Sequence, residues 1–133
     1  MAFVADNSVI VGWFISSQAS ELTRTALRRS RRERVHVPAL WQLEFSNVRV
    51  GLERRSLIAA HQVDAIVAKV ERFGLEIHDA FASMSPLMHL MRAHGIKAYD
   101  ASYVHLAASL GVPLYTRDAR LRAAARSAGL TAP

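Results

Sequence analysis

Four acidic residues, far apart along the chain, occupy positions from which a folded backbone could aim them at one place. Two follow short apolar segments, one lies inside an apolar helical pattern and one starts a predicted helix: Asp6, Asp118, Glu44 and Asp100. Glu44 is the most informative, because an unpaired carboxylate among apolar side chains is very costly and needs a cation as partner. The pattern therefore predicts a charged site if the four side chains converge.

Such a cluster would do metal-assisted chemistry. Mutual repulsion raises the pKa values of close carboxyl groups unless a divalent cation balances their charge. A donor set made only of oxygen, in a chain without cysteine, matches Mg²⁺ or Mn²⁺. An ion held in this way can activate water and stabilise charge on the leaving oxygen of a phosphodiester. The acids therefore predict phosphodiester hydrolysis.

Structural roles would also explain these acids. Asp100 and Asp118 each precede a predicted helix, and an N-cap stabilises a helix end by roughly 1 kcal/mol without any catalytic duty. Asp6 could cap the first helix in the same way, and Glu44 could pair with Arg49 or another arginine. Spacing alone leaves both interpretations open.

The elements that would position the acids alternate between strands and helices. Short apolar segments predict strands over 3–5, 35–37, 75–77 and 112–116, with a short final strand at 130–131. Helical spacing predicts helices over 9–14, 21–32, 40–54, 57–73, 81–94, 100–110 and 119–128, the first capped by Ser8 and the fifth interrupted by Pro86. This alternation predicts an α/β fold with a parallel sheet covered on both faces. Ligands of such sheets bind beyond the carboxyl ends of the strands, where Asp6 and Asp118 are expected.

Composition sets limits on the class of protein. With 133 residues and no internal repeat or linker, the chain is expected to form a single domain over 1–133. No apolar stretch approaches the roughly 20 residues of a membrane span, and the first residues lack the pattern of a secretory signal, so we expect a cytoplasmic protein. The net charge of +6, carried almost entirely by arginine, favours a polyanionic partner, although solubilising charge explains it equally well.

Four local segments together resemble the PIN-domain ribonucleases, and within them the small VapC-like toxins of bacterial and archaeal toxin–antitoxin pairs. The segments are VADNSV at 4–9, VPALWQLEFSNV at 37–48, AYDASY at 98–103 and LYTRD at 114–118. Each is weak alone, but they occur in the order and spacing of the family and span almost the whole chain. Ala5 departs from the bulkier strand residue that is usual there, which concerns packing and leaves the acids intact.

The resemblance implies roles for particular residues. The quartet Asp6, Glu44, Asp100 and Asp118 would hold Mg²⁺ or Mn²⁺ and carry out catalysis. The hydroxyls of Ser8 and Thr116 would support the site, and Asn47, one turn after Glu44, would orient that carboxylate.

The resemblance also implies a fold, an activity and partners. The fold would be a three-layer α/β/α sandwich with a central, mostly parallel five-stranded sheet. The activity would be endonucleolytic hydrolysis of RNA, with homodimerisation and inhibition by a cognate antitoxin. One alternative is a PIN-fold RNA-binding or scaffold module without efficient turnover, because a ligand set does not guarantee a productive site. A nuclease acting on DNA ranks last, since the chain lacks the extra helical elements of such relatives.

Residues around the acids have two interpretations each. Arg117 adjoins Asp118 and is the residue we expect to contact substrate. A basic run precedes the second predicted strand: Arg24, Arg28, Arg29, Arg31, Arg32 and Arg34. These side chains could contact phosphates and form a rim around the acidic centre with four later arginines, Arg49, Arg54, Arg55 and Arg117. The alternative is that the run is solvated helix surface. Trp13, Phe14 and Trp41 could stack on bases or receive an antitoxin segment, with core packing as the alternative.

Overall fold

A parallel sheet forms the centre of the computed structural model, which describes residues 1–80 and 82–133. Its four strands, within the described residues, are β1 (Ala2–Ala5), β2 (Arg34–Pro38), β3 (Glu76–His78) and β4 (Leu114–Tyr115), in the order β3-β2-β1-β4. The register pairs Phe3 with Val35, Val4 with Leu114 and Val37 with Ile77. The chain builds outward from β1 to β3 and then returns to the other side of β1. The strand order therefore reverses beside β1, which is where such sheets bind ligands.

The expected α/β class with a parallel sheet is confirmed, but the expected fifth strand is wrong. Leu130 and Thr131 form no strand, although the Leu114 amide donates to the Thr131 carbonyl over 2.9 Å. The strand predicted over 112–116 shortens to two residues in β4. Such a short edge offers too few paired groups to build a further ladder.

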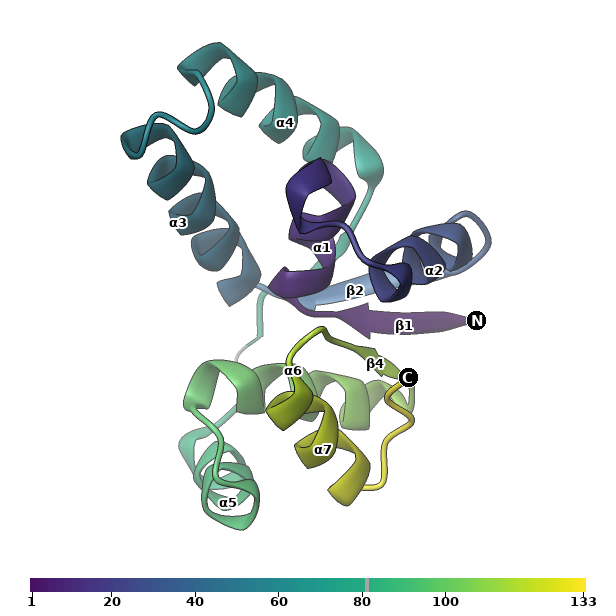
Figure 1. Ribbon diagram of the computed structural model, residues 1–133. Coiled ribbons are helices and arrows are strands. Elements are labelled where there is room, and N and C mark those ends of the chain that lie inside the picture. The colour runs from purple at the N-terminus through teal and green to yellow at the C-terminus, as the bar shows by residue number, and fades with distance from the viewer. Residues whose placement is uncertain (81) are drawn as a thin grey trace.

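Helices cover both faces of the sheet (Figure 1). One side carries α1 (Asn7–Phe14), the 3-10 turn η1 (Ser16–Gln18), α2 (Glu21–Ser30), α3 (Leu40–Arg54) and α4 (Ala60–Phe73). The other side carries α5 (Met84–His94), α6 (Ala98–Leu110) and α7 (Ala119–Ser127). None of the helices in the described part of the chain is long and apolar enough to cross a membrane.

The core lies between the sheet and these two helical layers. Phe3, Val4 and Ala5 are fully buried in succession, because β1 is covered on both faces. From one side α1 contributes Val9 and Ile10. From the other, α6 packs against β1 and β2 through small and branched side chains such as those at 101, 104 and 107. This packing brings the start of α6 to the carboxyl end of β1.

Helix boundaries differ from the predictions in ways that bear on the acids. The first helix is capped by Asp6, not by Ser8, since the Asp6 side chain accepts from the Val9 amide. Asp100 is the third residue of α6 and caps nothing, because α6 begins at Ala98. Pro86 lies in the first turn of α5, where its missing N–H is not needed, so it does not break the helix. The predicted start of that helix, Phe81, lies outside the described residues.

Candidate active site

A cleft of about 420 Å³ opens beyond the carboxyl ends of β1 and β4. All four acids line it: Asp6 from the end of β1, Glu44 from α3, Asp100 from α6 and Asp118 from the start of α7. They reach it from both sides of the sheet, since α3 lies on one face and α6 on the other (Figure 1). The fold therefore brings together four acids that are far apart in sequence.

Asp6 is the most constrained of the four, with 6% of its surface exposed. Its Oδ1 accepts hydrogen bonds from Ser8 Oγ over 2.6 Å and from the Val9 amide over 3.2 Å, while its Oδ2 accepts one from Thr116 Oγ1. Both hydroxyls that were expected to support the site therefore contact this carboxylate. These bonds fix its orientation toward the cleft.

The same two hydroxyls tie the end of β1 to the loop after β4. Ser8 Oγ accepts from the Arg117 amide over 2.9 Å, and Thr116 Oγ1 accepts from the Asp118 amide over 3.0 Å. Each hydroxyl thus donates to Asp6 and accepts from the loop. The position of Asp118 is coupled in this way to that of Asp6.

Glu44 is held by a residue that the sequence analysis did not single out. Tyr103 donates from its phenolic hydroxyl to Glu44 Oε1 over 2.7 Å. Burial and the nearby charge of Glu44 raise the pKa of Tyr103, so the phenol remains a donor. Asn47 has an exposed side chain, and no hydrogen bond joins it to Glu44 within the described residues. The sequence signal that could have identified Tyr103 is its spacing, because it lies three residues after Asp100 and therefore on the same face of the helix.

Burial and shared negative charge raise the pKa values of three carboxyl groups. Burial is the largest cause for Asp6, where three hydrogen bonds oppose it and the charge of Asp100 adds to it. Burial also raises the pKa of Glu44, with Asp6 and Asp100 contributing repulsion. For Asp100 the causes are burial and then the charge of Asp118. The site is thus an electrostatically coupled group that disfavours four simultaneous negative charges.

Two of the acids cap a helix and also line the cleft. Asp118 Oδ1 accepts from the amides of Arg120 over 2.8 Å and Leu121 over 3.3 Å, so it caps α7 as one interpretation predicted. Asp6 caps α1. Among the described residues neither Arg49 nor another arginine forms an ion pair with Glu44. Arg49 instead stacks on the Phe45 ring, with its guanidinium carbon 4.0 Å from the ring centroid.

The donor set fits a hydrated divalent cation. No Lys or Arg in the described part of the chain forms an ion pair with any of the four acids. Among those residues no three acidic or imidazole groups lie close enough to hold a metal ion by themselves. Mg²⁺ needs no such cage, because it keeps several waters and takes one or two carboxylates directly. A cleft of raised-pKa carboxyl groups can therefore accept such an ion.

Of the arginines considered for a rim around the acids, two line this cleft. Arg117 and Arg55 line it, and Arg117 Nη1 donates to the Gln18 carbonyl over 2.8 Å at its edge. Three arginines lie at the amino ends of the strands, opposite the acids: Arg31 and Arg32 between α2 and β2, and Arg34 as the first residue of β2. These arginines therefore do not form a complete rim around the acidic centre, and the other interpretation, solvated helix surface, applies to the basic run.

The aromatic residues considered for base stacking pack in the interior. Trp13 lies against Phe73 with ring centroids 5.2 Å apart, and Phe14 meets Phe45 edge-on at 6.3 Å. Trp41 is 4% exposed. Core packing thus explains all three.

The chain belongs to the PIN-domain family, whose model matches residues 3–127. Over 123 residues it is 28% identical to Ribonuclease VapC3 of Pyrobaculum aerophilum, covering 91% of this chain and 92% of that protein. The family resemblance inferred from the four local segments is therefore confirmed.

Solved structures share the fold at low sequence identity. PAE2754 from Pyrobaculum aerophilum superposes with a TM-score of 0.74 at 17% identity, covering 99% of this chain and 83% of that one. VapBC2 from Rickettsia felis, bound to a DNA fragment from their promoter, gives a TM-score of 0.68 at 15% identity, covering 100% and 98%. These similarities support the PIN architecture described above.

Proposed function

We propose that this protein is a metal-dependent endoribonuclease that hydrolyses RNA phosphodiester bonds and serves as the toxin of a VapBC-type toxin–antitoxin pair. One observation carries the proposal: four carboxylates from four separate elements line a single cleft at the switch point of a PIN fold. The likeness to Ribonuclease VapC3 over nine-tenths of the chain supports RNA as the substrate.

The four acids and the hydroxyl groups bonded to them each have a part in this proposal. Asp6, Glu44, Asp100 and Asp118 would hold Mg²⁺ or Mn²⁺, which supplies activation of water and stabilisation of the charge that develops on the leaving oxygen. Ser8 and Thr116 orient Asp6 through their hydroxyls. Tyr103 takes the corresponding part for Glu44, instead of Asn47.

Arg117 would attract the substrate to this cleft. Its side chain is exposed at the edge, held by the Gln18 carbonyl, and it carries the positive charge that a phosphate needs beside an acidic centre. A change to glutamine should therefore weaken RNA binding more than it changes the cleavage step.

The partners follow from the same assignment. We propose a cognate antitoxin, a second copy of the chain, and action in the cytoplasm; the fold neighbour from Rickettsia felis was solved as VapBC2. Exposed apolar side chains offer surface for such contacts: Leu43, Met84, Met88 and Tyr99. No residue of α5 is buried in the isolated chain, which is consistent with a face that is covered in an assembly.

Cleavage of a mixed cellular RNA pool tests the proposal. Purified protein should cut RNA with Mg²⁺ or Mn²⁺ and stop with a chelator, and Asp6→Asn and Asp100→Asn should each reduce cleavage at least about 100-fold, as expected when transition-state charge loses its support. Asp64→Asn, an exposed acid on α4, is the matched control and should cut normally. Cleavage that survives both cleft variants or the chelator would overturn the assignment.

The alternative of an RNA-binding or scaffold module has one observation in its favour, namely the separation of the acids within the described chain. A thermal shift that reports metal binding, combined with the cleavage assay, distinguishes the two. Mg²⁺ or Mn²⁺ should raise the melting temperature of the native protein and not that of Asp6→Asn, because the ion relieves the repulsion among the carboxylates. Metal binding together with RNA binding, but without cleavage of any RNA, would favour the module.

A further inference from the structure

Two arginines on the exposed face of α2, Arg24 and Arg28, form a row with Arg31, the residue that caps the C-terminus of this helix. Arg24, Arg28 and Arg31 are spaced by four and three residues, which places them on one side of a helix. All three are exposed, and the side chains of Arg24 and Arg28 have 56% and 60% of their surface accessible. We call these residues the α2 arginine row.

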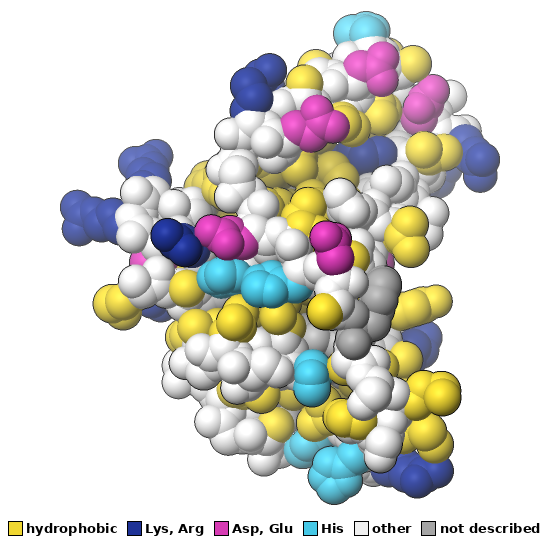
Figure 2. All heavy atoms as spheres, turned by 180° about the vertical axis from the view of Figure 1, so that it is seen from behind, with side chains coloured by type: hydrophobic (Ala, Val, Ile, Leu, Met, Phe, Trp, Pro, Cys, Tyr) yellow, Lys and Arg dark blue, Asp and Glu magenta, His cyan; other side chains and the backbone are white. Residues whose placement is uncertain are grey.

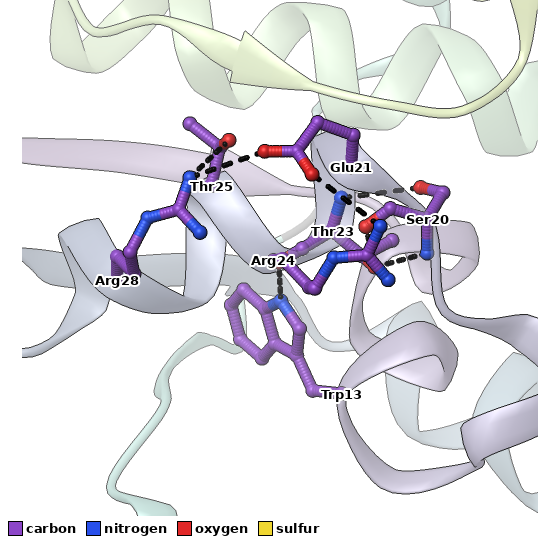
Figure 3. Close-up of polar contacts among 7 residues, drawn as sticks. All are labelled: Trp13, Ser20, Glu21, Thr23, Arg24, Thr25 and Arg28. Carbon is purple, nitrogen blue, oxygen red and sulfur yellow. Dashed lines mark hydrogen bonds and ion pairs between the residues drawn. The ribbon is translucent and has the colours of Figure 1, made fainter.

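The helix that carries the row is firmly attached to the rest of the protein. Ser20 and Thr23 exchange backbone and side-chain hydrogen bonds at the start of α2, at 2.8 and 3.2 Å. Trp13 of α1 donates from its indole nitrogen to the Thr23 carbonyl over 2.8 Å (Figure 3). Because Asp6 caps the start of α1, the row keeps a defined position relative to the acidic cleft.

Arg117 links one edge of the cleft to the segment just before α2. Arg117 binds the carbonyl of Gln18, which lines the cleft and lies three residues before α2 begins. From there α2 runs toward the amino ends of the strands, where Lys and Arg side chains project from the molecule on the left of Figure 2. An RNA strand that leaves the cleft over Arg117 and follows α2 would therefore pass several exposed cations in succession.

Glu21 holds two members of the row without removing their charge. Its carboxylate accepts from Arg24 and from Arg28, each over 3.3 Å, and Arg28 also donates to Thr25 Oγ1 over 2.9 Å (Figure 3). Ion pairs this exposed are weak and screened by salt. They restrict the guanidinium groups to the surface of α2 and leave donors available, so the row with Glu21 keeps a net positive charge.

We propose that the α2 arginine row binds the phosphates of RNA that extends beyond the acidic cleft. The proposal rests on the proposed nuclease function and narrows its substrate to long RNA. The seven residues from Arg24 to Arg31 span about 10 Å of helix, and a stacked RNA strand rises about 3.4 Å per nucleotide, so the row accompanies roughly three nucleotides. Guanidinium groups suit this task because they donate to phosphate in a planar, bidentate manner.

Binding measured in chelator, where no cutting is expected, tests the row separately from catalysis. Fluorescence anisotropy would compare a 20-nucleotide RNA with a four-nucleotide RNA of related sequence. The triple variant Arg24→Gln/Arg28→Gln/Arg31→Gln should bind the long RNA at least about tenfold more weakly and lower the slope of log affinity against log salt by about 2. The short RNA should bind as it does to the native protein.

The matched control removes the same charge elsewhere. Lys69→Gln/Arg72→Gln/Arg92→Gln changes three exposed cations of α4 and α5 and should leave long-RNA affinity within about twofold. Equal weakening by the control and the row variant would show only general attraction and would overturn the proposal. Native cleavage of short RNA by the row variant would show that the nuclease and the row are independent.

Glu21→Gln makes the test independent of helix stability. If the row binds phosphate, loss of this carboxylate should tighten binding of the long RNA, opposite to the effect of losing the arginines. If the ion pairs only stabilise α2, both changes should lower the melting temperature and neither should alter affinity selectively. Long-RNA affinity that is unchanged in both variants would overturn the proposal, whether or not the protein cleaves RNA.

Discussion

Tyr103 on α6 donates a 2.7 Å hydrogen bond to Glu44 on α3, and this bond joins helices from opposite sides of the sheet across the acidic cleft. Tyr103 is 1% exposed, so its ring is locked in the core while its hydroxyl reaches the cleft. The bond lowers the pKa of Glu44 against the effects of burial and of Asp6 and Asp100. Tyr103 thus favours the ionised form of a carboxylate whose surroundings disfavour its charge.

Tyr103→Phe should reduce cleavage about tenfold and lower the unfolding free energy by about 1 kcal/mol at neutral pH, because ionised Glu44 loses its donor. The pKa of Glu44 should rise further. A carboxyl group whose pKa is raised in the folded state contributes stability at pH values below its unfolded-state pKa, and this contribution is lost as pH rises. The free-energy difference between Tyr103→Phe and the native protein should therefore shrink as pH falls toward the ordinary pKa range of Glu. Urea unfolding at pH 7 and pH 4.5 measures this difference. Tyr99→Phe, on the same helix but exposed, should show neither effect.

Gly12 and Gly51 should respond oppositely to alanine. A Cβ at Gly12 would lie 2.5 Å from Thr23 Cγ2 and 2.9 Å from the Gln18 carbonyl oxygen, so Gly12→Ala should destabilise the protein by about 1–3 kcal/mol. A Cβ at Gly51 would have Arg55 Nη2 at 4.0 Å as its nearest neighbour, so Gly51→Ala should stabilise α3 by about 0.5–1 kcal/mol. Thermal unfolding shows whether each substitution raises or lowers the stability of the protein. A neutral Gly12→Ala would mean that α1 and α2 can move apart at little cost.

Arg49→Met should stabilise the isolated chain. The Arg49 side chain is 1% exposed, and within the described residues its three guanidinium nitrogens have no hydrogen-bond partner. Replacing such a charge by an apolar side chain of similar length removes a desolvation penalty, for a gain of about 1–3 kcal/mol. Arg54→Met on the exposed side of α3 is the control, expected within about 0.5 kcal/mol of the native protein. Chemical denaturation decides the sign, and destabilisation by Arg49→Met would contradict the account.

The histidine pair at the β2–β3 edge should make stability depend on pH. His36 Nδ1 and His78 Nε2 lie 2.8 Å apart, where Figure 2 shows histidine side chains together. Burial and then His78 lower the pKa of His36, with Arg34 adding to the shift and Glu76 opposing it. A lowered folded-state pKa gives stability that is complete above the unfolded value of about 6.5 and declines as pH falls below it.

Melting temperatures from pH 7.5 to 5.5 check this expectation. The native protein should lose more stability over that range than His36→Gln, whose side chain does not titrate. His61→Gln, an exposed position on α4, should follow the native profile. Parallel curves for the native protein and His36→Gln would contradict the lowered pKa of His36.

Local patterns predicted the elements best where the apolar spacing was long. The helix predicted over 40–54 has those bounds as α3, because fifteen residues provide several turns of periodic signal. The two-residue β4 was predicted too long, since a strand end depends on its neighbours rather than on its own residues. Leu43 fits the apolar spacing of α3 but is 69% exposed, which no local pattern indicates.

The sequence by itself determined which residue types follow each strand and open each helix, and hence that Asp6 and Asp118 would lie at element boundaries, because these patterns depend on near neighbours. Only the tertiary structure decided their partners. Thr116 reaches Asp6 across 110 positions and Tyr103 reaches Glu44 across 59. Such contacts depend on strand order and on how α3 and α6 pack around the sheet, which is decided by burial of the whole core rather than by any segment of the chain.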